Sequence, residues 1–301
     1  MTTDRGLPVR ENIAVIGAGT MGIGVSHAFA AGGHHVTLVD IGKPALDRAA
    51  EEIARNVRLF GMVGGTPEST PGATLAAITF STELADVADA DFVVENITEN
   101  FSLKQRVYRE LDEMCKPAAV FGVNTSAIPI TRIAGLTERA DRVVGTHFMN
   151  PVPLKPLVEV IRGFHTSPET IAFTRDLISR LGKDTAVVED SPGFVTNRAM
   201  MLMVNEAICL LQEGVAPAAE IDRLFVQCFG HRMGPLATAD LIGLDTVLYS
   251  LDVLLENFNE PKYRPSLLLR KLVDAGHLGR KTGQGLFDYR TTDPTTVPER
   301  N

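Results

Sequence analysis

Short apolar runs alternate with amphipathic stretches over the first two thirds of the chain. One run ends just before Gly17 and a second ends at Asp40. Further runs rich in Val, Ile and Phe cover residues 91–96, 119–126, 142–148, 157–161 and 184–190. Such runs predict buried strands, and the stretches 102–115 and 168–181 between them predict helices. This alternation predicts an α/β fold with a mostly parallel, doubly wound sheet.

The pattern changes near EDSPGFVTNR (189–198). Asp190 or Ser191 can cap a helix there, with Pro192 in its first turn. From that point to about Cys228 apolar residues recur at helical spacing, and most of the remaining chain also predicts helix. We therefore expect two domains: a nucleotide-binding α/β domain at 1–189 and an all-α domain at 190–301.

Composition narrows the possible functions. The chain has 301 residues, of which 45% are hydrophobic and 22% charged, as in soluble globular proteins. A net charge of -8 disfavours nucleic acid as a partner. Three cysteines without metal-ligand spacing indicate a reducing compartment and no metal site. The polar N-terminus lacks the apolar core of a signal peptide, so we expect a cytoplasmic protein that does not enter a membrane.

A glycine pattern after the first apolar run predicts a dinucleotide site. Gly17 permits a tight turn, Gly19 lets the backbone approach a pyrophosphate, and Gly22 lets the following helix pack closely. The free N–H groups of that helix favour phosphate. We expect Thr20 and Met21, within the same turn, to contact the cofactor as well.

The acid at the end of the second run indicates which dinucleotide binds. Asp40 can accept hydrogen bonds from two ribose hydroxyls and would repel a 2'-phosphate, which favours NAD over NADP. Lys43 lies close enough to weaken this preference slightly.

Polar side chains follow several of the predicted strands, where open α/β sheets bind their ligands. Ser126 and His147 stand at two such ends, and Asn150 follows His147 in a loop with three prolines. Glu159 lies within the next apolar run, LVEVI, where an unpaired acid is costly. Taken singly, His147 could be a hydrogen-bonded core histidine and Glu159 a strand residue facing solvent.

Several stretches together resemble the L-3-hydroxyacyl-CoA dehydrogenase family. They are GAGTMG, VVENITENFSLKQ, NTSAIPIT, HFMNPVPLKPLVEVI, DSPGFVTNR, MGPLATADLIGLDT and GRKTGQGLFDY, which span residues 12–289 in the family's order. The resemblance implies an NAD-dependent oxidation of a 3-hydroxyacyl thioester to the 3-oxoacyl thioester. It also implies an α/β Rossmann-type domain followed by an all-α domain that usually forms a homodimer.

The resemblance assigns roles to individual residues. It implies that His147 and Glu159 form a catalytic pair, while Ser126 and Asn150 hold the substrate oxygen. It further implies that Asn197 contacts the substrate near the thioester. It also implies that Glu99, Lys104 and Asn124 lie beside the cofactor. The residue chemistry agrees: alcohol oxidation needs a base for the hydroxyl proton, and a carboxylate on the far imidazole nitrogen fixes the tautomer of that base.

The carrier of the acyl group stays open at this point. Between Leu59 and Leu103 there is no Lys or Arg to meet the 3'-phosphate of CoA, and the nearest cations are Arg55 and Arg58. An acyl carrier protein presents the same pantetheine arm without that phosphate. A carrier-bound glyceryl substrate, as in methoxymalonyl extender-unit biosynthesis for polyketides, is therefore an alternative to CoA. A basic patch with Arg106 and Arg109 would be needed for an acidic carrier.

Two further classes are alternatives. Dehydrogenases of free hydroxy acids that use a catalytic lysine in a K-x-x-x-N pattern are disfavoured, because SPGFVTNR has no such lysine. The L-gulonate dehydrogenase type shares the His–Glu pair and remains open. A non-catalytic, crystallin-like protein is disfavoured because both His147 and Glu159 are present.

Overall fold

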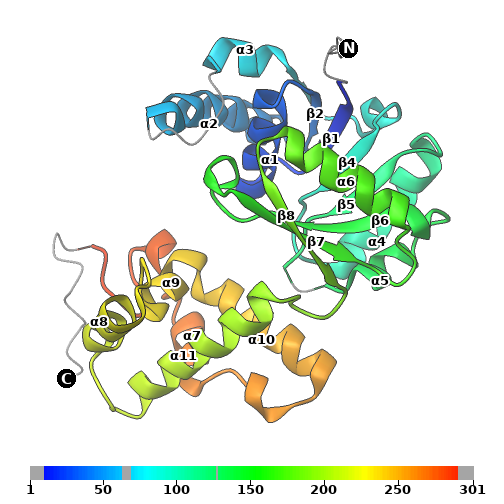
Figure 1. Ribbon diagram of the computed structural model, residues 1–301. Helices are drawn as coiled ribbons and strands as arrows, with labels where there is room; N and C mark the ends of the chain where they lie inside the picture. The colour runs from blue at the N-terminus through cyan, green and yellow to red at the C-terminus, as the bar shows by residue number, and fades with distance from the viewer. Residues whose placement is uncertain (1–9, 63–68, 127, 291–301) are drawn as a thin grey trace, which may run out of the picture. The chain divides into compact units, whose positions relative to one another are not determined.

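The computed structural model describes residues 10–62, 69–126 and 128–290. These residues divide into two compact units, the first of which runs to Asp190 while the second begins at Ser191 (Figure 1). No described helix has both the length and the apolar character needed to cross a membrane.

The first unit contains one eight-stranded sheet in the order β3-β2-β1-β4-β5-β6-β7-β8. All neighbouring strands pair in parallel except β6 and β7, which are antiparallel. The strands are β1 (Asn12–Ile16), β2 (His35–Val39), β3 (Ile78–Ser81), β4 (Phe92–Glu95), β5 (Val120–Val123), β6 (Val143–His147), β7 (Leu157–Arg162) and β8 (Asp184–Glu189). The predicted doubly wound, mostly parallel sheet is confirmed. Only β3 was absent from the prediction, because its sequence ITFS has two polar residues and forms no apolar run.

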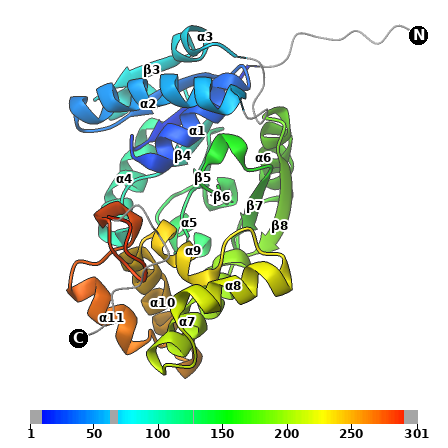
Figure 2. The same ribbon diagram turned by 90° about the vertical axis from the view of Figure 1, so that its left-hand side faces the viewer.

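Helices cover both faces of this sheet. They are α1 (Thr20–Ala31), α2 (Lys43–Met62), α3 (Pro71–Ala76), α4 (Phe101–Met114), α5 (Ile130–Ala134) and α6 (Pro168–Arg180), with short 3-10 turns η1 (Leu84–Val87), η2 (Ala140–Arg142) and η3 (Val152–Leu154). Side chains of α1, α2 and α6 join one apolar core against the sheet. In both views α1 and α2 run side by side (Figures 1 and 2).

The strand order creates a crevice at the middle of the sheet. The chain steps from β1 to β2 in one direction and from β4 to β5 in the other. Right-handed crossovers then place α1 and α4 on opposite faces. The loops after β1 and β4 therefore separate at the carboxyl edge of the sheet, which is where such folds bind ligands.

The second unit is helical. It consists of α7 (Thr196–Gln212), α8 (Ala218–Phe229), α9 (Pro235–Ile242), α10 (Leu244–Phe258) and α11 (Leu267–Asp274), with 3-10 turns η4 (Pro261–Tyr263) and η5 (Arg280–Thr282). Their apolar faces form a core of their own. This confirms the predicted helical region.

The start of the helical region differs from the prediction in one respect. Asp190 does not cap a helix beginning near Pro192, since the next helix starts only at Thr196. Its carboxylate instead accepts hydrogen bonds from the backbone N–H groups of Ile130, at 3.0 Å, and Thr131, at 2.8 Å, in the first turn of α5. The long apolar periodicity to Cys228 is also interrupted, because Gly214 and Pro217 separate α7 from α8.

The glycine-rich C-terminal stretch has a structural role. The Asp240 carboxylate accepts hydrogen bonds from the backbone of Leu286 and Phe287, each at 2.9 Å. A Cβ on Gly279 would lie 2.3 Å from the Asp240 carbonyl oxygen, and one on Gly285 would lie 2.1 Å from its Oδ1. The glycines therefore let the chain return close enough to be held by this buried acid.

Candidate functional site

The turn between β1 and α1 has the backbone that its glycines predict. Gly17 has a φ of +98°, and a Cβ there would lie 2.9 Å from the Asn96 carbonyl oxygen in the loop after β4. A Cβ on Gly22 would lie 1.8 Å from the Gly17 carbonyl oxygen. At Gly19 a Cβ would meet nothing within 4 Å. The backbone at Gly19 thus faces open space beside the first turn of α1, which leaves room for a phosphate.

Thr20 and Met21 begin α1 at this turn. Thr20 is exposed and Met21 is half-buried. No side chain caps this end of α1, and its first turn contains no acid. The positive end of the helix dipole is therefore not neutralised by the protein.

Asp40 lies directly after β2 and beside the glycine turn. Its Oδ2 accepts a hydrogen bond from the Ala18 N–H at 2.8 Å, and its Oδ1 accepts one from the Gly42 N–H at 3.0 Å. Each oxygen keeps a further lone pair for a ribose hydroxyl. Because the carboxylate is fixed at this place, the residues around it fit NAD and oppose a 2'-phosphate.

His147 and Glu159 form a buried pair across β6 and β7. The two residues stand opposite each other in the antiparallel register, so their side chains project from the same face of the sheet. Nδ1 of His147 lies 3.0 Å from Oε2 of Glu159, and the two residues are 4% and 2% exposed. The costly acid in the LVEVI run is therefore paired, which removes the alternative that Glu159 faces solvent.

Ser126 extends this pair into a three-residue array. It follows β5, the neighbour of β6 in the sheet, and its Oγ lies 3.2 Å from Nε2 of His147. Glu159, His147 and Ser126 are thus connected in order through both ring nitrogens. This arrangement orients the imidazole and presents Nε2 beside a hydroxyl at the carboxyl edge of the sheet.

A buried ionic cluster supports the loop that carries Ser126. The Lys104 ammonium lies 2.8 Å from both Glu95 carboxylate oxygens and 3.3 Å from Oε2 of Glu99. Oε1 of Glu99 accepts hydrogen bonds from the Thr125 hydroxyl and, at 3.3 Å, from the Ser126 N–H. Burial raises the pKa of Glu95, and the ammonium of Lys104 opposes that shift.

The exposure of this cluster separates Glu99 from Lys104. The Lys104 side chain is 0% exposed, whereas that of Glu99 is 25% exposed. Glu99 can therefore contact a ligand at the surface, while Lys104 can act on that ligand only through its ion pair with Glu99. This geometry corrects the direct cofactor contact implied for Lys104.

The three asparagines with expected roles in the site, Asn124, Asn150 and Asn197, occupy different environments. The Asn124 amide is buried: it donates to Oδ1 of Asn96 at 2.5 Å and accepts from the Phe148 N–H at 3.2 Å, so it joins the ends of three strands. Asn150 is exposed in the loop after His147. Asn197 is half-buried in the first turn of α7, in the second unit.

Sequence patterns did not assign a role to Asn96 or to the Glu95–Lys104 pair. Glu95 ends the apolar run of β4 and Asn96 follows it, and this position at a strand end was the only signal for these two residues. Their partners are set by contacts between strands and cannot be read from spacing. Within the described ranges, no group of three or more His, Cys, Asp or Glu side chains could hold a metal ion.

Family models match both units. The model of the 3-hydroxyacyl-CoA dehydrogenase NAD binding domain matches residues 12–191, and that of the 3-hydroxyacyl-CoA dehydrogenase C-terminal domain matches residues 193–289.

Similar proteins carry related names. A probable 3-hydroxybutyryl-CoA dehydrogenase of Bacillus subtilis is 42% identical, over 93% of this chain and 97% of its own. One of Deinococcus radiodurans is 44% identical, over 91% and 99% respectively. The crystal structure of (S)-3-hydroxybutyryl-CoA dehydrogenase from Ralstonia eutropha superposes with a TM-score of 0.87 at 42% identity, covering 93% of this chain and 99% of that one.

Proposed function

The chain belongs to the 3-hydroxyacyl-CoA dehydrogenase family, and we propose that it oxidises the 3-hydroxyl group of a 3-hydroxyacyl-CoA thioester with NAD. The observation that carries the proposal is the array of Glu159, His147 and Ser126 at the carboxyl edge of the sheet. It places an oriented imidazole in the fold's ligand-binding region.

The proton path follows from the two ring nitrogens of His147. Glu159 accepts the Nδ1–H, which leaves Nε2 unprotonated and able to take the hydroxyl proton of the substrate. The imidazolium formed in this step is stabilised by the buried Glu159 carboxylate. Ser126 and the exposed Asn150 donate to the substrate oxygen and hold it near Nε2. When bound, NAD supplies the acceptor for the hydride that leaves the carbon atom.

The cofactor would be held by the turn at Gly17, Gly19 and Gly22 and by Asp40. We assign Glu99 to the cofactor side of the reaction centre, because part of its side chain is exposed while its Oε1 is bonded to Ser126. The buried Lys104 ammonium positions the Glu99 carboxylate through their ion pair. Asn124 fixes the strand ends beneath the cofactor, and Asn197 would contact the thioester end of the substrate.

We infer that CoA, not an acyl carrier protein, presents the acyl group. The helix α2 exposes Arg55 and Arg58, one turn apart, and both can meet the 3'-phosphate of CoA. The similar proteins named above carry CoA substrates in their names. From Leu59 to Leu103 the sequence has no Lys or Arg, so Arg55 and Arg58 are the cations that this proposal assigns to the phosphate.

A turnover assay tests this proposal directly. NAD reduction is followed by absorbance with 3-hydroxybutyryl-CoA, the same acid on pantetheine, a glyceryl group on acyl carrier protein, and free hydroxy acids including L-gulonate. The expected result is the highest kcat/KM with the CoA thioester. A preference for the carrier-bound substrate would assign the enzyme to extender-unit chemistry. A preference for a free acid would refute the proposal that the substrate is a thioester.

Asp40 should set the cofactor preference. Asp40→Ala should weaken NAD binding and bring the affinities for NAD and NADP closer together, because the ribose loses an acceptor and the 2'-phosphate loses a repelling charge. Calorimetry with both oxidised cofactors measures the change. Equal affinities in the unaltered enzyme would show that Asp40 does not face the ribose.

We propose that two copies associate through the helical unit. Large apolar side chains are exposed on α8 and α9, among them Leu224 at 53%, Phe229 at 71% and Leu241 at 56%. Light scattering should give about twice the 32.5 kDa of one chain. Leu224→Asp should lower this mass, because association would then bury a charge. Phe164→Asp is the control, since Phe164 is 83% exposed on the first unit. A single-chain mass at micromolar concentration would contradict the proposal.

The cysteines favour a reducing compartment, which we propose is the cytoplasm. Cys115 is buried, Cys209 half-buried and Cys228 exposed, and all three are free thiols. Burial raises the pKa of Cys115 to about 11, so little of this thiol is present as the thiolate at neutral pH.

A further inference from the structure

Three prolines limit the backbone hydrogen bonds in the loop between His147 and Glu159, where the N–H groups of Leu154 and Lys155 donate to the Pro151 carbonyl oxygen at 3.0 and 3.2 Å. Pro151, Pro153 and Pro156 have no N–H group, so the segment cannot form a regular ladder of hydrogen bonds. Its carbonyl oxygens still need donors where they are buried. Asn150 stands at one end of this loop, and Glu159 follows at the other end within β7.

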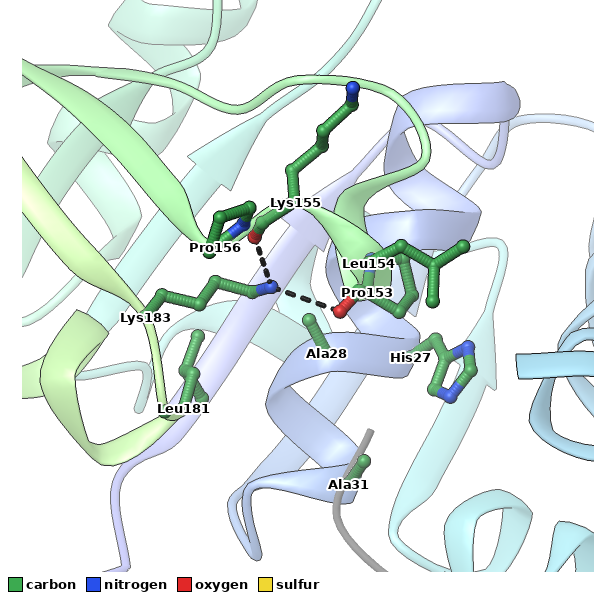
Figure 3. Close-up of a pocket in the computed structure, with 10 residues that line it drawn as sticks. His27, Ala28, Ala31, Pro153, Leu154, Lys155, Pro156, Leu181 and Lys183 are labelled. Carbon is green, nitrogen blue, oxygen red and sulfur yellow. Dashed lines mark hydrogen bonds between the residues drawn. The ribbon is translucent and has the colours of Figure 1, made fainter. Parts of the chain in front are cut away.

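A single ammonium group supplies those donors. Lys183 precedes β8 and is 7% exposed. Its Nζ donates hydrogen bonds to the carbonyl oxygens of Pro153 at 3.2 Å and Lys155 at 2.8 Å (Figure 3). It also donates to the Val152 carbonyl oxygen at 2.7 Å. An ammonium has three N–H donors, so this loop takes all of them. Burial lowers the pKa of Lys183, whereas three carbonyl dipoles facing the ammonium favour its charged form.

Packing holds the buried part of the loop, at Val152 and Pro153. Val152 lies against α1, where a Cβ on Gly24 would approach its side chain to 3.0 Å. On another side the loop borders a cavity of about 220 Å³, lined by Pro153 and Leu154 of the loop together with Ala28, Ala31 and Leu181 (Figure 3). Because side chains do not fill that volume, the hydrogen bonds of Lys183 restrain the loop on this side.

We propose that Lys183 is a positioning residue for the oxidation, acting through the backbone of residues 152–155. It holds that segment so that Asn150 and Glu159 keep their places about His147. The inference rests on the proposed function, because it takes His147 as the base. Lys183 itself contacts neither substrate nor cofactor.

Lys183→Met removes the ammonium and keeps most of the apolar stem. Turnover should fall about ten- to hundredfold, as expected when a reacting group shifts by a fraction of an ångström to an ångström. The dissociation constant of NAD should stay within about twofold, because Lys183 donates to carbonyl oxygens of the loop and to no residue of the nucleotide turn. Lys155→Met is the matched control: it removes an exposed lysine from the same loop and should leave turnover unchanged. Equal turnover in the two variants would overturn the proposal.

A double variant separates positioning from general destabilisation. In an enzyme that already carries Glu159→Gln, Lys183→Met should cost less than about threefold, since the two residues serve the same geometry. Losses that multiply would point to a purely structural role and would overturn the proposal. If Lys183→Met does not fold, Lys183→Gln keeps two donors and carries the same comparison, with a smaller expected loss.

A readout without substrate makes the result independent of the proposed reaction. Nitrogen-15 NMR of the labelled histidine rings reports the Nδ1–H hydrogen bond of His147 to Glu159, and Glu159→Gln identifies its signal. Lys183→Met should shift or broaden that signal while Lys155→Met leaves it in place. An unchanged signal in Lys183→Met refutes the positioning role, even if the enzyme turns over none of the thioesters. A shifted signal without turnover would refute only the proposed substrate.

Discussion

Replacing His147 with glutamine should lower the turnover of a 3-hydroxyacyl-CoA thioester by about two to four orders of magnitude. Glutamine keeps the polar character of the position but cannot take a proton at neutral pH. The loss should appear in kcat, because the base acts in the chemical step. Steady-state kinetics in the oxidation direction measures it.

The affinity for NAD and a matched histidine provide the controls. Calorimetry should give nearly the same NAD dissociation constant in His147→Gln, since the cofactor turn lies on β1 and α1. His165→Gln alters an exposed histidine after β7 and should retain full turnover. A His147→Gln enzyme with more than about a tenth of the original turnover would exclude His147 as the base.

Glu159→Gln should cause a loss of similar size. The amide occupies the same volume but carries no charge, so the imidazolium formed during the reaction loses its stabilisation. The amide can also present its N–H groups to Nδ1, which would favour the wrong tautomer of His147. Circular dichroism and thermal unfolding establish that the variant is folded before its kinetics are compared.

The double variant tests whether the pair acts as one unit. Nδ1 of His147 and Oε2 of Glu159 are 3.0 Å apart, so neither residue performs its role without the other. The combined variant should therefore lose little more than the worse single variant, as residues in one catalytic unit do. A combined loss equal to the product of the single losses would contradict the coupled mechanism.

Much of the fold could be predicted because its signals are local. Apolar runs of strand length identified every strand except β3, and the glycines marked the turn after β1 through their backbone requirements. The positions of Ser126 and His147 at strand ends indicated that both lie at the carboxyl edge of the sheet. Periodicity failed where a contact is distant: Asp190 resembles a helix cap for its own segment, yet it binds the start of α5, 60 residues earlier.

The sequence by itself determined the chemistry available to this protein: a dinucleotide turn, an acid for the ribose, a histidine and a glutamate near strand ends. Only the tertiary structure decided which of these groups meet. The antiparallel register of β6 and β7 sets Glu159 opposite His147, and burial encloses Lys104 behind Glu99. The fold also brings Lys183, which precedes β8, to the loop between His147 and Glu159. Side-chain types are fixed residue by residue, whereas pairing and burial depend on how strands distant in the chain align, which no local pattern encodes.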